Sequence, residues 1–225
     1  MKPELVITKD GSASLYSIEF DEHYHSIHGA LQESQHVFIQ AGLLHKMKAD
    51  ISKSISILEI GFGTGLNALL TAIEAQDYQL RISYTAIERY PLELALYAQL
   101  NYGTILQNST GELLFKTIYT SDWEMEMELS PGFALRKCKM NIEDIDFSNQ
   151  FDLIYFDAFA PSAQPELWTK SVFDSMYAAL KPGGILVTYC AKGEVKRTMK
   201  SAGFKVEPLP GPVGKREMTR AIKII

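Results

Sequence analysis

The chain has 225 residues, of which 46% are hydrophobic and 22% are charged, and its formal net charge is −5. These values are ordinary for a globular protein, and the length suits one large domain with a full core. No stretch of roughly 18 residues is both uncharged and apolar throughout, as a membrane span requires, and the N-terminus lacks the apolar core of a signal peptide. We therefore expect a cytoplasmic protein with no membrane segment. Cys138 and Cys190 stand alone, so neither a CxxC metal site nor a disulfide framework is expected.

Residues 1–50 are predicted to form an N-terminal extension packed on the core. Apolar and polar residues alternate over Leu15 to Phe20, which predicts a strand, and Gly29 to Leu44 have apolar residues at helical spacing. The aromatic segment between them holds three histidines at spacings of two and three residues: His23, His25 and His28. Such spacing is more typical of packed or surface histidines than of a metal site, so no metal is expected.

A buried strand followed by a glycine-rich turn is the most informative stretch of the chain. Ile55 to Ile60 is nearly continuous in apolar residues, which is typical of a parallel strand buried on both faces. Glycines let the backbone turn sharply and approach a ligand closely, although a purely structural turn can also use them. The acid-x-G-x-G-x-G spacing differs from the dinucleotide pattern G-x-G-x-x-G and suits S-adenosylmethionine, which has no phosphate. The residues of this pattern are Glu59, Gly61, Gly63 and Gly65, with Asn67 just beyond.

A second strand–acid pair supports a nucleoside cofactor. Ile82 to Ile87 reads as the next strand and ends at Glu88, which lies 23 residues after Gly65. A strand–helix–strand unit places an acid about 20 residues beyond the glycines, where it accepts hydrogen bonds from the ribose hydroxyls. The alternative is an ordinary solvated acid.

The middle of the chain is less regular. Pro91 to Leu100 predicts a helix opened by proline, and residues 101–134 read as an insertion. Within the insertion, Trp123 to Glu128 fits either a strand or a helix.

A third buried strand, Phe151 to Phe156, ends at Asp157, the residue to which we assign the chemistry. Ligands of open α/β sheets lie outside the carboxyl ends of the strands, so Asp157 is expected to face the same crevice as the glycine turn. The segment D-A-F-A-P is similar to the D-P-P-Y loop of amino-group methyltransferases, in which oxygens accept hydrogen bonds from an amine. Asp157 would then position the amine, with Phe159 and Pro161 as pocket walls. The alternative is an acid that only caps the loop.

The remaining elements complete an α/β fold. They are a helix at Leu167 to Leu180, a turn at 181–184, a strand at Ile185 to Tyr189, a helix at Val195 to Ala202, and strands at Phe204 to Glu207 and Met218 to Ile225. Together they predict a doubly wound, Rossmann-like methyltransferase domain over residues 51–225, with a mostly parallel sheet of seven strands.

Positive charge is concentrated near the C-terminal end. From Lys181 onward ten basic residues stand against three acids, a net of +7, which leaves −12 for the residues before it. A basic end on an acidic body is typical of a surface that binds a polyanion such as RNA, and also of an ordinary solvated face. The adjacent pair Lys215 and Arg216 favours RNA and places both residues among the candidates for substrate binding.

Several segments together resemble one family, the methyltransferase domain of the tRNA-modification protein MnmC and its stand-alone relatives. The matching segments run almost end to end: F-D-E-H-Y at 20–24, E-S-Q-H-V-F at 33–38, G-F-G-T-G-L-N at 61–67, I-E-R-Y-P-L at 87–92, D-A-F-A-P at 157–161, P-E-L-W-T at 165–169 and G-K-R-E-M at 214–218. The combination is far more specific than a glycine turn alone.

The resemblance implies methyl transfer from S-adenosylmethionine to the amine of 5-aminomethyl-2-thiouridine at the tRNA wobble position, which gives the 5-methylaminomethyl product. It implies that the three glycines hold the methionine end, that Glu88 holds the ribose and that Glu33 reaches the cofactor from the extension. Asn141 is the candidate for the adenine contact through its amide oxygen, with Glu143 or Asp144 as alternatives.

Bifunctional members of that family also carry a flavin-dependent oxidase domain, of which these 225 residues contain no counterpart. The expected partner is tRNA. The chain would need either an aminomethyl tRNA made directly by the upstream enzymes or a separate upstream enzyme that supplies the aminomethyl group. Two alternatives remain: a small-amine transferase acting on a polyamine or metabolite, and a non-catalytic binding module.

Overall fold

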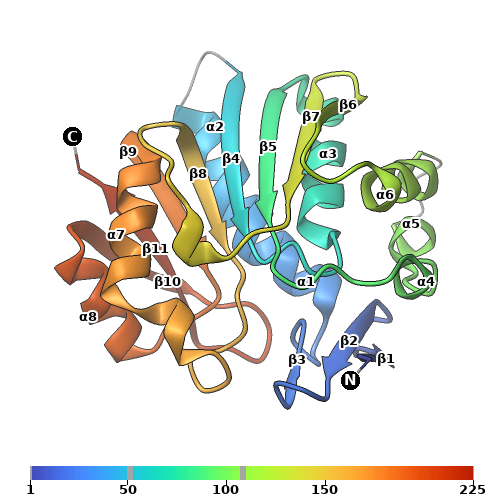
Figure 1. The fold of residues 1–225 in the computed structure, drawn as a ribbon, viewed down its shortest axis with the longest axis horizontal. Helices are drawn as coiled ribbons and strands as arrows, with labels where there is room; N and C mark the ends of the chain where they lie inside the picture. Colours follow the sequence, from blue (N-terminus) through green and yellow to red (C-terminus); the bar gives the residue numbers. More distant parts are fainter. Residues whose placement is uncertain (1, 50–52, 107–109, 225) are drawn as a thin grey trace.

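A computed structural model describes residues 2–49, 53–106 and 110–224, which form a sheet covered by helices on both faces (Figure 1). The sheet has eight strands in the order β10-β11-β9-β8-β4-β5-β7-β6. The five central strands are parallel. On one side β6 runs antiparallel to β7, and on the other β11 runs antiparallel to both of its neighbours, β9 and β10. In the same order the strands are β10 (Phe204–Pro210), β11 (Glu217–Lys223), β9 (Leu180–Thr188), β8 (Phe151–Phe156), β4 (Ser54–Ile60), β5 (Arg81–Ile87), β7 (Phe133–Cys138) and β6 (Glu126–Ser130).

The central strands are buried on both faces because a hydrophobic cluster lies on each side of the sheet. In β8, Leu153 and Tyr155 belong to one cluster, whereas Ile154 and Phe156 belong to the other. This alternation follows from the period of two in a strand. Every residue of β8 is buried, including Asp152, the one charged residue in its otherwise apolar sequence.

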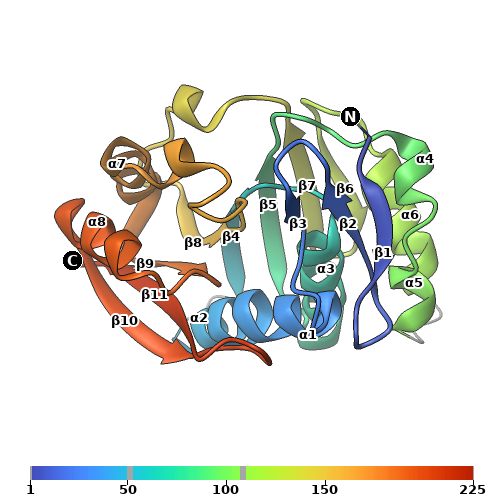
Figure 2. The same ribbon diagram turned by 90° about the horizontal axis from the view of Figure 1, so that it is seen from below.

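One face of the sheet is covered by the N-terminal helix and α3, and the opposite face by α7 and α8 (Figure 2). The N-terminal helix, residues 30–49, packs closely against β8 and β9 because Gly42 has no side chain. A Cβ there would lie 3.1 Å from the side chain of Val187 and 3.2 Å from that of Tyr155. The helices on the first side are α1 (Ala30–Ser34), η1 (Gln35–Leu44, a π-helix), α2 (His45–Ala49) and α3 (Leu66–Tyr78), with α4 (Leu94–Tyr97), α5 (Tyr102–Ile105) and α6 (Gly111–Thr120) beyond α3. On the other side are α7 (Lys170–Ala179) and α8 (Gly193–Ser201), and two short 3-10 turns are η2 (Ile142–Asp144) and η3 (Pro165–Trp168).

The first residues form a separate small antiparallel sheet that lies below the carboxyl ends of the central strands in Figure 1. Its strands are β1 (Glu4–Ile7), β2 (Ala13–Ser17) and β3 (Glu22–His23). Ala13 and Leu15 of β2 are completely buried and belong to the same hydrophobic cluster as α3. The sequence boundary expected between residues 50 and 51 lies outside the described residues.

The fold corrects four details of the sequence prediction. The main sheet has eight strands rather than seven, because part of the undecided segment 123–128 becomes β6, which forms a hairpin with β7 across Pro131 and Gly132. The helix expected at 91–100 is reduced to α4, and the one expected at 167–180 starts as η3 before α7. Residues 181–184, which were expected to form a turn, are part of β9, and the pairing of β9 with β8 shifts its register there. The insertion expected at 101–134 includes residues 107–109, which are not described.

Asn101 links the N-terminal sheet to the core. Its Oδ1 accepts a hydrogen bond from the N–H of Ala13 at 2.7 Å, and its Nδ2 donates to the carbonyl of Gly11 at 2.9 Å. Because Ala13 is completely buried, Asn101→Ala would leave its N–H without a partner. We expect the free energy of unfolding in urea to fall by about 1–3 kcal/mol. The matched control, Gln99→Ala, removes only an exposed local bond to Ala95 and should change it by less than about 0.5 kcal/mol. Equal effects of the two substitutions would contradict the linking role.

Candidate active site

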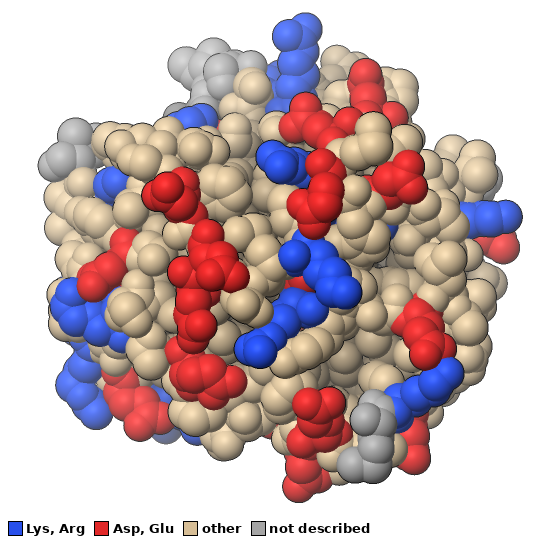
Figure 3. Space-filling model, in the orientation of Figure 1, with Lys and Arg blue, Asp and Glu red and all other residues tan. Residues whose placement is uncertain are grey.

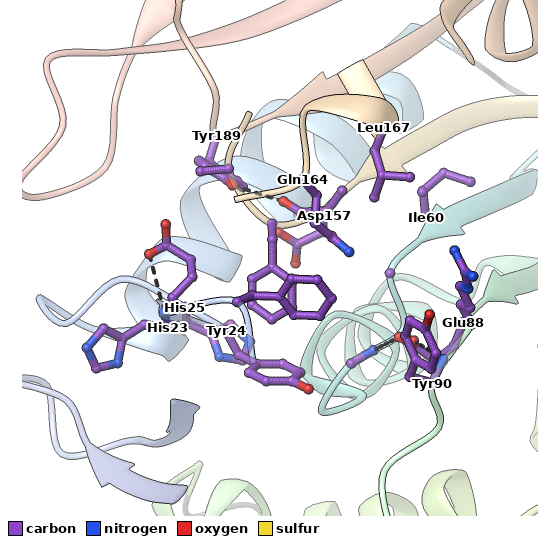
Figure 4. Close-up of a pocket in the computed structure, with 18 of the residues that line it drawn as sticks. His23, Tyr24, His25, Ile60, Glu88, Tyr90, Asp157, Gln164, Leu167 and Tyr189 are labelled. Atoms are coloured by element: carbon purple, nitrogen blue, oxygen red, sulfur yellow. Dashed lines mark hydrogen bonds between the residues drawn. The ribbon is translucent and has the colours of Figure 1, made fainter. Parts of the chain in front are cut away.

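A cavity of about 570 Å³ opens at the carboxyl ends of β4, β5, β8 and β9, where open α/β sheets bind ligands. This volume is within the range of small-molecule sites. Segments distant in sequence enclose the cavity, including residues 22–28 of the extension and Gly214 and Lys215 near the C-terminus. Figure 4 shows Glu88 beside Tyr90, and Asp157 nearer to Tyr189.

The glycine turn brings the end of β4 against the end of β8. Gly61 has φ +87°, and a Cβ there would lie 2.6 Å from the carbonyl oxygen of Asp157. Gly63, with φ +48°, lies against the ring of Tyr24 and lines the cavity. Gly65, with φ +76°, precedes the first residue of α3. Positive φ and close backbone approach are the two conditions that favour glycine, and both apply at Gly61.

Glu88 stands at the end of β5 with its carboxyl group held by backbone amides. Oε2 accepts the N–H of Gly63 at 3.0 Å, and Oε1 accepts the N–H of Tyr90 at 2.8 Å. The side chain is partly exposed and lines the cavity. Burial raises the pKa of this carboxyl group, while the backbone hydrogen bonds oppose the rise. Its position and fixed orientation suit the two hydroxyls of a ribose.

Asp157 follows β8 directly and faces the cavity. Its Oδ2 accepts a hydrogen bond from Nδ2 of Asn67 at 2.8 Å, and Asn67 donates its second amide proton to Oε1 of Glu59 at 2.9 Å. Burial and the nearby Glu33 raise the pKa of Asp157 to about 7, although the Asn67 hydrogen bond and the Lys215 cation act in the opposite direction. Asp157 therefore changes its protonation state near neutral pH.

Glu33 and Lys215 form an ion pair across the cavity. Glu33 is nearly buried, and its other oxygen accepts the N–H of Ser26 at 2.7 Å. The Nζ of Lys215 lies 3.9 Å from the ring centre of Tyr189, which is a cation–π contact. The hydroxyl of Tyr189 in turn donates to the carbonyl of Ala158 at 2.9 Å. These contacts connect the extension and the C-terminal loop to the residues beside Asp157.

Aromatic rings form one wall of the cavity. The ring of Phe159 lies 5.1 Å from that of Phe20 and 4.9 Å, edge to face, from that of Tyr24. Trp168 supports this wall from behind: it is 5% exposed, packs on Phe156 and donates its Nε1–H to the carbonyl of Phe159 at 2.9 Å. Trp168 is thus a packing residue that fixes the loop carrying Phe159.

The residues predicted from sequence do not all reach the cavity. Gly61, Gly63, Glu33, Glu88, Asn141, Asp157, Phe159 and Lys215 line it. Asn67 borders a small adjoining pocket instead. Glu59 is completely buried behind the turn, and the lining does not include Gly65, Pro161 or Arg216. Asn141 donates to Asp144 at 3.1 Å, and Glu143 lies beside it in the lining.

The histidines of the extension do not converge. His25 contacts Ser14 and Thr64, His23 packs on Tyr16, and His28 lies against the backbone of Gly214. Over residues 2–49, 53–106 and 110–224 there is no group of three or more His, Cys, Asp or Glu residues able to hold a metal ion. No helix within the same residues is long and apolar enough to cross a bilayer. Both cysteines are free and buried.

Comparison with known proteins identifies the family. A family model described as S-adenosyl-L-methionine-dependent methyltransferase matches residues 105–224, more than half of the chain. The chain belongs to this family. Its cofactor is therefore S-adenosylmethionine, as the glycine spacing and Glu88 predicted.

Curated relatives of this methyltransferase include several proteins named tRNA 5-methylaminomethyl-2-thiouridine biosynthesis bifunctional protein MnmC. The protein from Leptospira interrogans is 31% identical over 95% of this chain, and the one from Marinobacter nauticus is 31% identical over 97%. The aligned part is 34% and 36% of those two proteins, so the chain spans about a third of their length.

Solved structures agree with this family. The crystal structure of MNMC2 from Aquifex aeolicus is 26% identical and has a TM-score of 0.79, with 98% of this chain and 70% of that chain covered. Spermidine synthase from Thermotoga maritima is 16% identical with a TM-score of 0.56, over 94% and 69% of the two chains, and shares the fold.

Sequence reasoning did not assign a role to several lining residues of the methyltransferase. Phe20 and Tyr24 lie in a segment that the family resemblance includes, but nothing in their spacing indicates a position at the cavity. Tyr189 follows β9 at the carboxyl edge of the sheet. The same rule that indicated Asp157 could have indicated Tyr189.

Asp157 should reduce the stability of the folded methyltransferase at neutral and higher pH. Its pKa is raised from the ordinary 3.8 to about 7, so the folded state binds this proton more tightly than the unfolded chain. Stability is therefore lost as pH rises from about 4 to about 7. We expect Asp157→Asn to raise the free energy of unfolding by about 1–3 kcal/mol at pH 8 and to change it little at pH 4, as measured in urea.

The control for this measurement is Asp174→Asn, which removes an exposed acid paired with Lys170. It should produce no gain at pH 8. A stability difference between Asp157→Asn and the unmodified protein that is independent of pH would contradict the raised pKa.

Proposed function

We propose that the protein methylates the amine of 5-aminomethyl-2-thiouridine at the wobble position of tRNA. The observation that carries this proposal is the position of Asp157, whose carboxyl group faces an acidic cavity from directly beside the glycine turn. The curated relatives named for 5-methylaminomethyl-2-thiouridine biosynthesis support the choice of substrate, since their aligned third covers 95% and 97% of this chain.

The cofactor would lie between the glycine turn and Glu88. Gly61 and Gly63 would hold the methionine end, Glu88 the ribose hydroxyls and Asn141 the adenine amine. Glu33 would approach the methionine end from the extension. Gly65 would act indirectly, by shaping the turn before α3. S-adenosylmethionine supplies an electrophilic methyl group on a positively charged sulfur.

The charge of the cavity favours cationic ligands. Among the described residues its lining contains six acids and two cations: Glu22, Glu33, Glu88, Glu143, Asp157 and Glu166, with Arg89 and Lys215. A cavity lined mainly by one sign of charge raises the local concentration of oppositely charged ligands. Both the sulfonium cofactor and a substrate ammonium group fit this field, whereas the product cofactor without its sulfonium charge fits it less well.

Asp157 would orient the amine and accept its proton. The Asp157 carboxylate would first take one proton from the substrate ammonium group, which leaves a neutral amine with a free lone pair. The nitrogen would then bond to the methyl carbon as the bond from carbon to sulfur breaks, and the electron pair of that bond would stay on sulfur. With a pKa of about 7, Asp157 is a suitable acceptor near neutral pH. Alignment of the reacting groups can lower the barrier by about 7–11 kcal/mol, so a strong base is unnecessary.

The aromatic wall formed by Phe20, Tyr24 and Phe159 would hold the uracil ring, because base–aromatic stacking tolerates the unpaired base of an anticodon loop. Pro161 would stiffen the loop behind Phe159. Arg216 is exposed at the rim, next to Lys215, and would contact tRNA phosphate.

Fewer cations of the C-terminal end are available to bind RNA than the sequence indicates. Figure 3 shows basic and acidic side chains interspersed over one face of the molecule. Ion pairs occupy five of the ten cations counted above, namely Lys181, Lys196, Lys205, Lys215 and Arg220. We infer that tRNA contacts a few cations near the cavity rather than one broad basic surface. The reaction also consumes a primary amine, so another activity has to form the aminomethyl group beforehand.

The first test is methyl transfer from labelled S-adenosylmethionine to tRNA that carries unmethylated aminomethyl wobble uridine. Label should appear in the wobble nucleoside, and Asp157→Ala should reduce its rate about 100-fold or more. Cofactor binding measured by calorimetry should remain. Label in polyamines but not in tRNA would instead favour a small-amine transferase.

The charges beside Asp157 should set the pH dependence of this reaction. Lys215 lowers the pKa of Asp157 and Glu33 raises it. Because the ionised carboxylate accepts the proton, kcat should rise with pH around the pKa of Asp157. Lys215→Met should move this rise to higher pH, and Glu33→Gln should move it to lower pH. The pH profile of single-turnover methylation measures both shifts.

The amine of free tRNA also titrates, but in the same way for all variants, so differences among profiles measured at subsaturating tRNA report on the enzyme. Shifts of the two variants in the same direction would contradict the assignment of the rise to Asp157.

A further inference from the structure

Two carboxyl groups share a single amide below the cavity. Asn67, on α3, donates one proton of Nδ2 to Oε1 of Glu59 and the other to Oδ2 of Asp157, at 2.9 and 2.8 Å. Glu59 belongs to β4 and is completely buried, whereas Asp157 is partly exposed toward the cavity. The amide therefore joins a carboxyl group in the core to the one that we place at the substrate.

The two carboxyl groups cannot both be ionised without strong repulsion, because both accept from the same nitrogen of Asn67 and Glu59 is completely buried. Among the described residues, no Lys, Arg or His forms an ion pair with Glu59. Asp157 has the cation of Lys215 nearby and an open side toward solvent in the cavity. Of the two carboxyl groups, Glu59 is therefore the one that keeps its proton.

The unpaired buried atoms around Glu59 also indicate that its carboxyl group is protonated. Glu59 Oε2, Asn67 Oδ1 and the Tyr84 hydroxyl are buried and have no hydrogen-bond partner in this arrangement. Buried polar atoms are rarely left unpaired, and each one costs about 1–3 kcal/mol. A neutral Glu59 carries a hydroxyl on Oε2, which is a donor, and both Asn67 Oδ1 and the Tyr84 oxygen are acceptors. An ionised Glu59 would accept the Tyr84 O–H, but it would have no proton for Asn67 Oδ1, which can only accept.

We propose that Glu59 is a positioning residue that acts as a neutral carboxylic acid through Asn67. Its carbonyl oxygen orients the Asn67 amide, which holds Oδ2 of Asp157. No described residue donates a hydrogen bond to Oδ1 of Asp157, so that oxygen is free for the substrate amine. This inference assigns Glu59, which does not line the cavity, a role behind Asp157 rather than at the cofactor.

Several other titratable groups face the pair and enter any pH measurement. Glu33, Lys215, Tyr102 and Tyr189 act on or respond to Asp157, and Glu88, Tyr84, Tyr97 and Tyr155 act on or respond to Glu59. Every tyrosine among them has a raised pKa because of burial, so these hydroxyls stay neutral near pH 7.

Infrared difference spectroscopy tests the protonation of Glu59 without any activity. At about pH 9, two units above the pKa of Asp157, that residue is ionised. The C=O band of a protonated carboxyl group should be present in the unmodified protein, absent in Glu59→Gln and retained in the matched controls Asp157→Asn and Glu88→Gln. Loss of this band in a control but not in Glu59→Gln would overturn the proposal.

Kinetics test the positioning role, and this arm rests on the proposed function. Glu59→Leu, which offers no oxygen to Asn67, should lower kcat about 10- to 100-fold with little change in KM, because the carboxylate of Asp157 is misplaced. Glu59→Gln keeps an oxygen acceptor without a charge and should recover most of that loss. If the glutamine variant is as slow as the leucine variant, an ionised Glu59 is required and the proposal is wrong.

Asn67→Leu provides a second kinetic readout. The hydrogen bond from Asn67 lowers the pKa of Asp157. Its removal should therefore move the rise of kcat to higher pH, an effect that a general loss of packing would not produce. An unchanged profile would contradict the link between Asn67 and Asp157. If the unmodified protein methylates no tRNA, the proposed function fails, while the infrared result still decides the state of Glu59.

Discussion

The close approach of β4 and β8 at their carboxyl ends is the constraint on which the site depends. Gly61 leaves no Cβ between the turn and the carbonyl of Asp157, and the N–H of Asp157 donates to the carbonyl of Ile60 at 2.9 Å. The glycine turn and the acid loop are consequently two sides of one backbone contact. A side chain at position 61 would separate them and would move Asp157 away from any ligand seated on the turn.

Burial and two neighbouring charges set the pKa of Asp157, the acid at this contact. Asp157 has a pKa near neutrality because it is partly desolvated beside Glu33, and Lys215 limits the rise. Each of the two residues comes from a segment far from Asp157 in sequence, one in the extension and one in the loop before β11. The extension and the C-terminal loop therefore do more than cover the cavity, since together they adjust the acid at its centre.

Local sequence patterns were sufficient to predict the parallel core and its ligand edge, because buried strands and glycine turns have strong periodic signals. Glu88 and Asp157 were predicted for the same reason: each follows directly after such a strand. The patterns did not predict β6, since Glu126 and Glu128 alternate with methionines at an exposed edge. Nor did they place Phe20, Tyr24 or Tyr189 at the cavity, because tertiary packing of the extension decides those positions.

Glu59 illustrates the limit of motif reasoning most clearly. The acid before the three glycines reads as part of the cofactor motif, yet a period of two along β4 directs its side chain into the core, where α3 supplies Asn67. A carboxyl group in that position is costly unless it is neutral and hydrogen-bonded. Asn67 meets the second condition and reaches Asp157 with its remaining proton. The motif thus joins the cofactor turn to Asp157, the acid that we propose accepts the substrate proton, through one buried amide rather than through the ligand.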